Sequence, residues 1–111
     1  MKNGLFLLIQ STLKDKMSGY GKATYVNGVY HGYFENDLKE GKGTYTWTSG
    51  QKYEGDYVND LKEGKGTITY SSGDKYEGDW RGGKRTGYGI HTYANGDVKE
   101  GRWHENKYLG Q

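Results

Sequence analysis

The sequence predicts an all-β protein: a single-layer, elongated antiparallel sheet built from consecutive β-hairpins. One indication is composition, since the 111 residues include 20 glycines, 12 tyrosines, three tryptophans and two phenylalanines but no proline. A second is that only 32% of the residues are hydrophobic and 15% are aromatic, which leaves too few aliphatic side chains to fill a two-layer core. A third is a pattern that recurs every 22 or 23 residues.

Gly-x-Gly pairs set the phase of this repeat. The first glycines of the pairs lie 22, 23 and 23 residues apart, and another glycine follows after a further 23. An aromatic residue comes four positions after each pair, a glycine three positions later, and then a block with a central glycine between mostly aromatic ends. The pairs are Gly19/Gly21, Gly41/Gly43, Gly64/Gly66 and Gly87/Gly89, and Gly110 begins a fifth copy. The blocks are Tyr30–Phe34, Tyr53–Tyr57, Tyr76–Trp80 and Lys99–Trp103.

Together these segments resemble the MORN (membrane occupation and recognition nexus) repeat. The resemblance rests on YEGDW at Tyr76–Trp80, the short polar loops and GKGTYTW at Gly41–Trp47, and it covers residues 19–111 in several in-register copies. It implies an extended, grooved sheet that binds helices or peptides of partner proteins. It also implies roles in linking cytoskeletal or membrane-associated assemblies and, in some members, dimerisation.

The N-terminal residues 1–18 fit the repeat poorly and are expected to form a degenerate cap. Leu5–Thr12 is interpreted as a strand that pairs with Tyr20–Val26. A short helix is the alternative, because Leu5, Leu8 and Ile9 also fall at helical spacing. Residues 19–111 then form the array, about four repeats of 22–23 residues with the last one truncated.

Within the array, alternation along the chain predicts strands with two unlike faces. In Lys52–Tyr57 the aromatic residues and the glycine share one face and the charged residues share the other, and Gly64–Tyr70 divides in the same way. A local β-bulge would shift this assignment by one residue. Turns rich in Ser, Asn and Gly are expected to join the strands, at Asn27-Gly28, Ser49-Gly50, Ser72-Gly73 and Asn95-Gly96.

Regularly spaced glycines inside strands require an explanation, because glycine there costs entropy and packs nothing. We expect each missing side chain to leave room for a Tyr or Trp ring of a neighbouring strand to lie flat across the backbone. The structural glycines assigned on this basis are Gly32, Gly43, Gly55, Gly66, Gly78, Gly89 and Gly101. The last predicted strand, Val98–Trp103, is expected to have no following partner, with its charged residues protecting an open edge.

The sequence carries no pattern typical of an enzyme, a cofactor site or a metal site. Cysteine is absent, and His31, His91 and His104 occupy three different repeat positions. A net charge of +2, with acidic and basic residues interspersed, does not indicate a nucleic-acid surface. The longest apolar run, Leu5–Ile9, is too short to span a membrane or to form a signal-peptide core, so a cytoplasmic location is expected, with cytoskeletal or membrane association as the family implies.

The function predicted from these residues is a non-enzymatic scaffold that binds a partner helix or peptide along the aromatic and glycine face. Tyr and Trp combine apolar area with a polar tip, which suits a soluble binding surface. The same rings could instead pack only on each other and on the glycines. The residues assigned to the partner-binding face are Phe34, Trp47, Tyr53, Tyr57, Tyr70, Tyr76, Trp80, Tyr93 and Trp103.

Two other functions remain open. Anionic phospholipid binding would use cations expected in the hairpin loops, although Asp37, Glu40, Asp60 and Glu63 lie among them and offset their charge. The chain could also be an accessory region of a larger assembly, or form a homodimer. The cations assigned to lipid-contact loops are Lys39, Lys42, Lys62, Lys65, Lys84 and Arg85.

Overall fold

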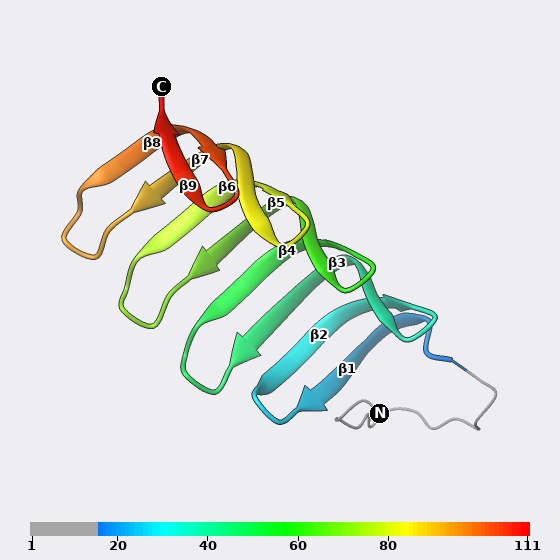
Figure 1. Ribbon diagram of the computed structural model, residues 1–111. Coiled ribbons are helices and arrows are strands. Elements are labelled where there is room, and N and C mark those ends of the chain that lie inside the picture. Colours follow the sequence, from blue (N-terminus) through cyan, green and yellow to red (C-terminus); the bar gives the residue numbers. More distant parts are fainter. Residues whose placement is uncertain (1–15) are drawn as a thin grey trace.

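The computed structural model describes residues 16–111, which form nine strands in one open sheet (Figure 1). The strands follow the chain order from β1 to β9, and every neighbouring pair is antiparallel. The predicted fold class, a single-layer sheet of consecutive hairpins, is therefore confirmed. The strands are β1 (Gly19–Tyr25), β2 (Gly28–Glu35), β3 (Leu38–Trp47), β4 (Lys52–Val58), β5 (Leu61–Thr69), β6 (Lys75–Arg81), β7 (Lys84–Thr92), β8 (Val98–His104) and β9 (Lys107–Gly110).

The sheet is elongated, with extents of 50 × 23 × 19 Å. Residues 16–111 contain no helix, and so none that is long and apolar enough to cross a membrane. The predicted cap strand or helix at Leu5–Thr12 lies outside the described residues. Lys16–Ser18, the described end of that cap, form neither a strand nor a helix.

Two kinds of turn alternate along the chain and lie on opposite long sides of the sheet (Figure 1). On one side, the longer turns include the predicted Ser49-Gly50, Ser72-Gly73 and Asn95-Gly96. The prediction of a turn at Asn27-Gly28 is off by one residue, because the first turn on this side is Val26-Asn27, without positive φ, and Gly28 begins β2. The short turns have only two residues, both with positive φ, as in Asn59 (48°) and Asp60 (71°). Asn, Asp and Gly tolerate this left-handed conformation, which matches the twist of a β-hairpin. The short turns are Asn36-Asp37, Asn59-Asp60, Gly82-Gly83 and Glu105-Asn106.

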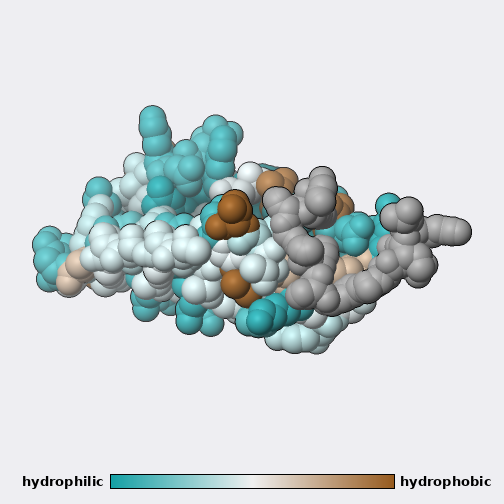
Figure 2. All heavy atoms as spheres, turned by 90° about the horizontal axis from the view of Figure 1, so that it is seen from below, coloured by the Kyte–Doolittle hydropathy of each residue, from teal (hydrophilic) through white to brown (hydrophobic). Residues whose placement is uncertain are grey.

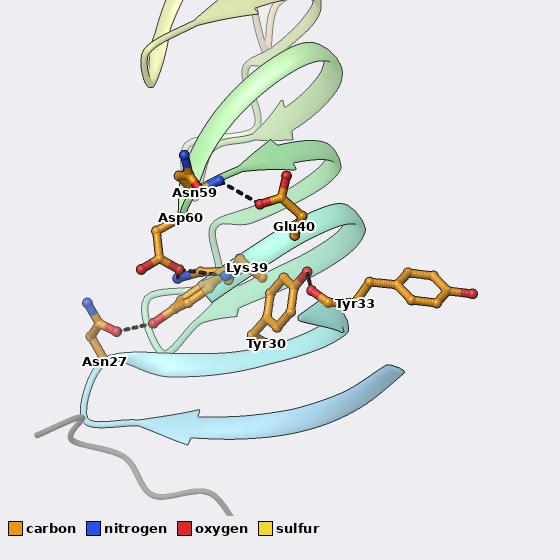
Figure 3. Close-up of polar contacts among 8 residues, drawn as sticks. Asn27, Tyr30, Tyr33, Lys39, Glu40, Asn59 and Asp60 are labelled. Carbon is orange, nitrogen blue, oxygen red and sulfur yellow. Dashed lines mark hydrogen bonds and ion pairs between the residues drawn. The ribbon is translucent and has the colours of Figure 1, made fainter. Parts of the chain in front are cut away.

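Short turns of successive repeats are joined to each other by a second set of hydrogen bonds outside the sheet, here called the turn ladder. The backbone N–H of Asp60 donates to the carbonyl of Lys39 at 2.9 Å, and the N–H of Lys39 donates to Asp60 Oδ1 at 2.7 Å (Figure 3). The strands bend toward these turns, with register shifts after the central glycines of β2, β4 and β6. The paired positions are Met17 with Asp37, Lys39 with Asp60, Lys62 with Gly83 and Arg85 with Asn106.

The core lies on one face of the sheet, here called the aromatic face. Eight glycines in register cross this face, one from each of the first eight strands, and the rings of Tyr30, Tyr53 and Tyr76 each cover two of the six in β2 to β7. A Cβ atom built on Gly66 would lie 2.3 Å from Tyr53 Oη, so only glycine fits beneath that ring. The Tyr53 hydroxyl reaches across and donates to the Asp56 carbonyl at 2.8 Å, and Tyr30 and Tyr76 repeat this bond in their own repeats. The buried apolar residues are Ala23, Tyr30, Phe34, Tyr45, Tyr53, Tyr57, Ile68, Tyr76, Trp80 and Trp103.

One expectation about the C-terminal side of the array is wrong. β8 does have a following partner, because β9 pairs with it through Trp103 opposite Tyr108 and His104 opposite Lys107. Glu105 and Asn106 adopt φ values of 44° and 73° and form the same short turn as the earlier repeats, although Glu is not among the residues that usually adopt this conformation. Gly110 also has the positive φ (105°) that Gly41, Gly64 and Gly87 show at the equivalent position.

Candidate partner-binding face

The nine rings assigned to the partner-binding face divide into a buried group and a half-exposed group. Burial is explained by the edge-to-face packing of Tyr53 against Tyr57 and Trp80, at centroid distances of 5.2 and 5.4 Å, which repeats along the sheet. Rings held this tightly by their own chain offer little surface to a partner. The buried rings are Phe34, Tyr53, Tyr57, Tyr76, Trp80 and Trp103, and the half-exposed rings are Trp47, Tyr70 and Tyr93.

The half-exposed rings form a line across the sheet, here called the aromatic strip: Tyr25, Trp47, Tyr70 and Tyr93. Each repeat contributes one of them, at the residue where a strand enters the turn on the side opposite the turn ladder. Their backbones are fixed, as in Tyr70, whose N–H donates to the carbonyl of Asp74 at 2.8 Å. Tyr25 was not among the predicted site residues, although it holds the same repeat position as Trp47 and could have been found from that spacing.

The aromatic face also carries a line of cations, here called the cation row: Lys39, Lys62 and Arg85. They occupy one repeat position, at the second residue of β3, β5 and β7. The Lys62 Nζ lies 5.6 Å from the ring centroids of Trp47, Tyr53 and Trp80. Such cation–π contacts contribute roughly 0.5–2 kcal/mol each, depending on desolvation. Lys39 has four rings within 5.3–5.7 Å of its Nζ, and Arg85 has two.

Placing the lipid-contact cations in hairpin loops is wrong, because the two-residue turns are so short that the chain has already re-entered the sheet at these positions. The cations also point to different faces. Lys42 and Lys65 lie on the face opposite the aromatic one, where their Nζ atoms pair with Asp56 at 2.6 Å and Asp79 at 2.5 Å. The six residues do not form one basic edge. Those in β3 are Lys39 and Lys42, those in β5 are Lys62 and Lys65, and those in β7 are Lys84 and Arg85.

The carboxylates that pair with these opposite-face lysines stay ionised. Partial burial would raise the pKa of Asp56, but hydrogen bonds from the Lys42 ammonium and the Lys65 backbone N–H outweigh it and lower that pKa below its ordinary value. The pKa of Asp79 is lowered in the same way, with Lys65 and Tyr88 as the donors. These ion pairs neutralise the charges of Lys42 and Lys65.

Members of the cation row differ in their counter-charges. Lys39 Nζ lies 3.4 Å from Asp60 Oδ1, and Arg85 bonds to Asn106. Among residues 16–111, Lys62 has no carboxylate within 4.0 Å of its Nζ. Two effects lower the pKa of its ammonium group: burial, which is the larger, and the positive charge of Lys39. Lys62 is thus a half-buried cation without a counter-ion in the described part of the chain.

Burial favours the neutral form of several tyrosines of this face. Burial raises the pKa of Tyr25 and of Tyr76 to about 12, and it also raises the pKa of Tyr70. His91 is the one buried ionisable residue that interrupts the pattern, with its Nε2 3.4 Å from Asp74 Oδ2 and its Nδ1 without a hydrogen-bond partner among residues 16–111. Within that range, no three His, Asp or Glu side chains lie close enough together to hold a metal ion.

Exposed aliphatic residues do not form a second binding surface. Val26 and Leu109 lie at opposite ends of the array, Val98 begins β8, and Val58 and Leu61 form a single cross-strand pair beside a short turn. Seen from below, the molecule shows hydrophobic residues only as small, separate patches (Figure 2). The aromatic strip and the cation row beside it therefore make up the candidate site.

These features define a repeat protein in which successive hairpins extend one sheet and stack their rings on one face. The MORN repeat model matches residues 13–29, 30–52, 53–75 and 76–98, and the chain belongs to the MORN-repeat family. MORN repeats are in general interaction modules, often membrane-associated, and are not a known family of enzymes. No curated protein matches the chain.

Proposed function

We propose that this chain binds a segment of a partner protein along the aromatic strip. The observation that carries this proposal is that four half-exposed rings, one per repeat, lie in a row on the aromatic face next to buried rings. Contacts with buried rings hold the strip in place. Tyr25 stacks on Tyr45 with ring centroids 5.9 Å apart, and Trp47 packs against Tyr45 with ring centroids 4.6 Å apart. Rings that are already ordered lose little entropy when a partner binds, which favours their use as anchors.

The dimensions of the strip suit a helix or an extended peptide. Neighbouring strands lie about 4.8 Å apart, so each repeat advances the strip by about 10 Å. From Tyr25 to Tyr93 the strip crosses three repeats, or about 29 Å, which matches a helix of about 19 residues. Both ring and cation positions repeat along this line, so a partner with a regular side-chain pattern meets the same surroundings in each repeat.

A protein partner is favoured over a membrane because of the charge arrangement. Membrane attraction needs clustered, uncompensated cations on one exposed surface. Here Lys42 and Lys65 are paired with carboxylates on one face, while Lys39 and Lys62 lie among rings on the other. Binding to anionic vesicles is therefore treated as an outcome that the experiment must be able to reveal.

The test is an affinity capture from the native cells with two matched variants. The first replaces Trp47 and Tyr70 on the strip with serine, and the second replaces Tyr33 and Tyr88, exposed rings of the opposite face, with serine. Circular dichroism and denaturant unfolding establish that both variants fold. We expect a protein retained by the intact chain and by the second variant to be lost from the first.

Two results would overturn the proposal. One is capture of the same protein by the folded strip variant, which would make the strip rings structural only. The other is that neither variant captures protein while both sediment with phosphatidylserine vesicles, which would make lipid the ligand.

A further inference from the structure

We propose that Gly83 and Lys62 form a receptor site for a carboxylate group, which an acidic segment of the partner protein supplies. This inference rests on the proposed function for the source of the carboxylate, but the site itself is argued from the repeat. The preceding repeat shows how such a site is filled. There Asp60 Oδ1 accepts the backbone N–H of Lys39 at 2.7 Å and lies 3.4 Å from the Lys39 ammonium (Figure 3).

The next repeat has the same backbone arrangement but lacks the carboxylate that accepts the hydrogen bond. Gly83 stands where Asp60 stands, with a similar φ (85° against 71°), and its N–H donates to the Lys62 carbonyl at 3.0 Å as that of Asp60 does to Lys39. Because Gly83 has no side chain, the backbone N–H and the ammonium of Lys62 face a position with no carboxylate of the described chain.

That position has room for an incoming group. A Cβ atom built on Gly83 would meet a single atom within 4 Å, Leu61 Cδ2 at 3.8 Å, which is an ordinary contact. The Lys62 side chain is held by the three rings around its Nζ, so the donors are pre-positioned. The site also adjoins the strip, since Trp47 belongs to both.

Comparison across the array singles out this repeat. The turn ladder has a side-chain acceptor at Asp37, at Asp60 and at Asn106, and only Gly83 lacks one. The nearby Glu63 carboxylate accepts the Gly82 N–H at 2.9 Å and forms no ion pair with Lys62, so the half-buried ammonium still has no carboxylate of residues 16–111 within 4.0 Å. Partly desolvated charges attract an opposite charge strongly. A carboxylate fits these two donors, because it can accept from both with one oxygen, as Asp60 does.

The first experiment uses sodium acetate as the probe and backbone amide NMR of the full chain as the readout. We expect acetate, compared with equal sodium chloride, to shift the Lys62 and Gly83 amide signals in a saturable way. Gly83→Asp should abolish this response by filling the site from within. Asp60→Gly should create a second response at Lys39, because it reproduces the empty arrangement there. Absence of any saturable shift in the intact chain, or an equal shift in the Gly83→Asp variant, would overturn the site.

The second experiment tests the source with an amphipathic leucine–glutamate peptide and the same peptide carrying glutamine. We expect the glutamate peptide to bind about 10- to 100-fold more tightly than the glutamine peptide, which corresponds to one charge-assisted contact. Gly83→Asp should reduce this ratio to within about twofold. A ratio unchanged by Gly83→Asp, or displacement of the glutamate peptide by phosphatidylserine vesicles, would overturn the assignment to an acidic protein segment.

The two proposals fail in distinguishable ways. In a Tyr70→Ser, Tyr93→Ser variant, which keeps the three rings around the Lys62 ammonium, loss of all peptide binding with the acetate response intact supports both. Peptide binding that survives in this variant contradicts the proposed function of the strip. An absent acetate response alongside strip-dependent peptide binding contradicts only the carboxylate site.

Discussion

Replacing Gly66 with alanine is expected to destabilise the sheet by about 2–4 kcal/mol, because the new Cβ occupies the space of a ring. That Cβ would lie 2.3 Å from Tyr53 Oη and 2.5 Å from its Cε1 and Cζ. Since an ordinary contact needs at least 3.4 Å, the ring must move by about 1 Å. Moving the Tyr53 ring has three costs of about 0.5–1.5 kcal/mol each. They are the strain of an unfavourable rotamer, the loss of the hydrogen bond to Asp56, and the loss of ring packing against Tyr57 and Trp80.

The assay is urea unfolding of single and double variants. Gly55→Ala serves as the comparison, because its two shortest Cβ contacts would be with backbone, Gly66 Cα at 2.4 Å and the Lys65 carbonyl oxygen at 2.5 Å, with Tyr53 Oη third at 2.7 Å. In a Tyr53→Leu background, which lacks the clashing ring atoms, Gly66→Ala should cost less than about 1 kcal/mol, whereas Gly55→Ala should keep most of its cost. A cost of Gly66→Ala that is the same in both backgrounds would refute the ring explanation.

Three further predictions concern the turn ladder, the ring hydrogen bonds and the tyrosine hydroxyls. Asp60→Gly keeps the positive φ but removes the acceptor for Lys39, and should lower the free energy of unfolding by about 1 kcal/mol in urea; no change would show that the ladder bond does not stabilise the fold. Trp80→Phe removes the Nε1–H bond to the Gly66 carbonyl (3.0 Å) and should cost about 1–2 kcal/mol, mainly as a lower midpoint with an unchanged slope. Burial raises the pKa of Tyr76 from 10.0 to about 12, so its stabilising contribution is complete below pH 10 and is lost as the pH rises toward 12; tyrosinate absorbance of Tyr76, compared with a Tyr76→Phe variant, should appear together with unfolding and not before it.

The strand order and the aromatic face could be predicted from the sequence because both follow from local rules. Alternation in Lys52–Tyr57 fixes which side chains share a face, and the turn at Ser49-Gly50 fixes which strands are neighbours. Since every hairpin contacts only the next one, no long-range topology had to be inferred. The register shift after Gly55 was foreseen only as a general β-bulge.

The cation row could not be predicted, because it depends on the curvature of the strands. Lys39 meets Asp60, 21 residues away, only because β2 and β4 bend beyond their central glycines and bring successive short turns together. From spacing alone, Lys39 and Lys42 were equivalent loop cations, yet one lies over rings and the other pairs with Asp56 on the opposite face. Sequence periodicity gives the repeat position of a residue, whereas bending of the sheet decides which groups of adjacent repeats meet.

The same comparison between repeats predicts how Gly83 affects stability. Gly83→Asp and Gly83→Asn place side chains of similar size at φ 85°, so their backbone cost is shared and their difference reports the charge. We expect the aspartate variant to be the more stable by about 1 kcal/mol at neutral pH, because it gives Lys62 the counter-ion that Lys39 already has. A carboxyl next to this ammonium has a folded pKa below its unfolded one, so the advantage is present above the unfolded pKa and disappears as the pH falls through the folded pKa. Urea unfolding of both variants at neutral and acidic pH measures this difference, and an aspartate variant that is no more stable at neutral pH would mean that the Lys62 site does not favour a carboxylate.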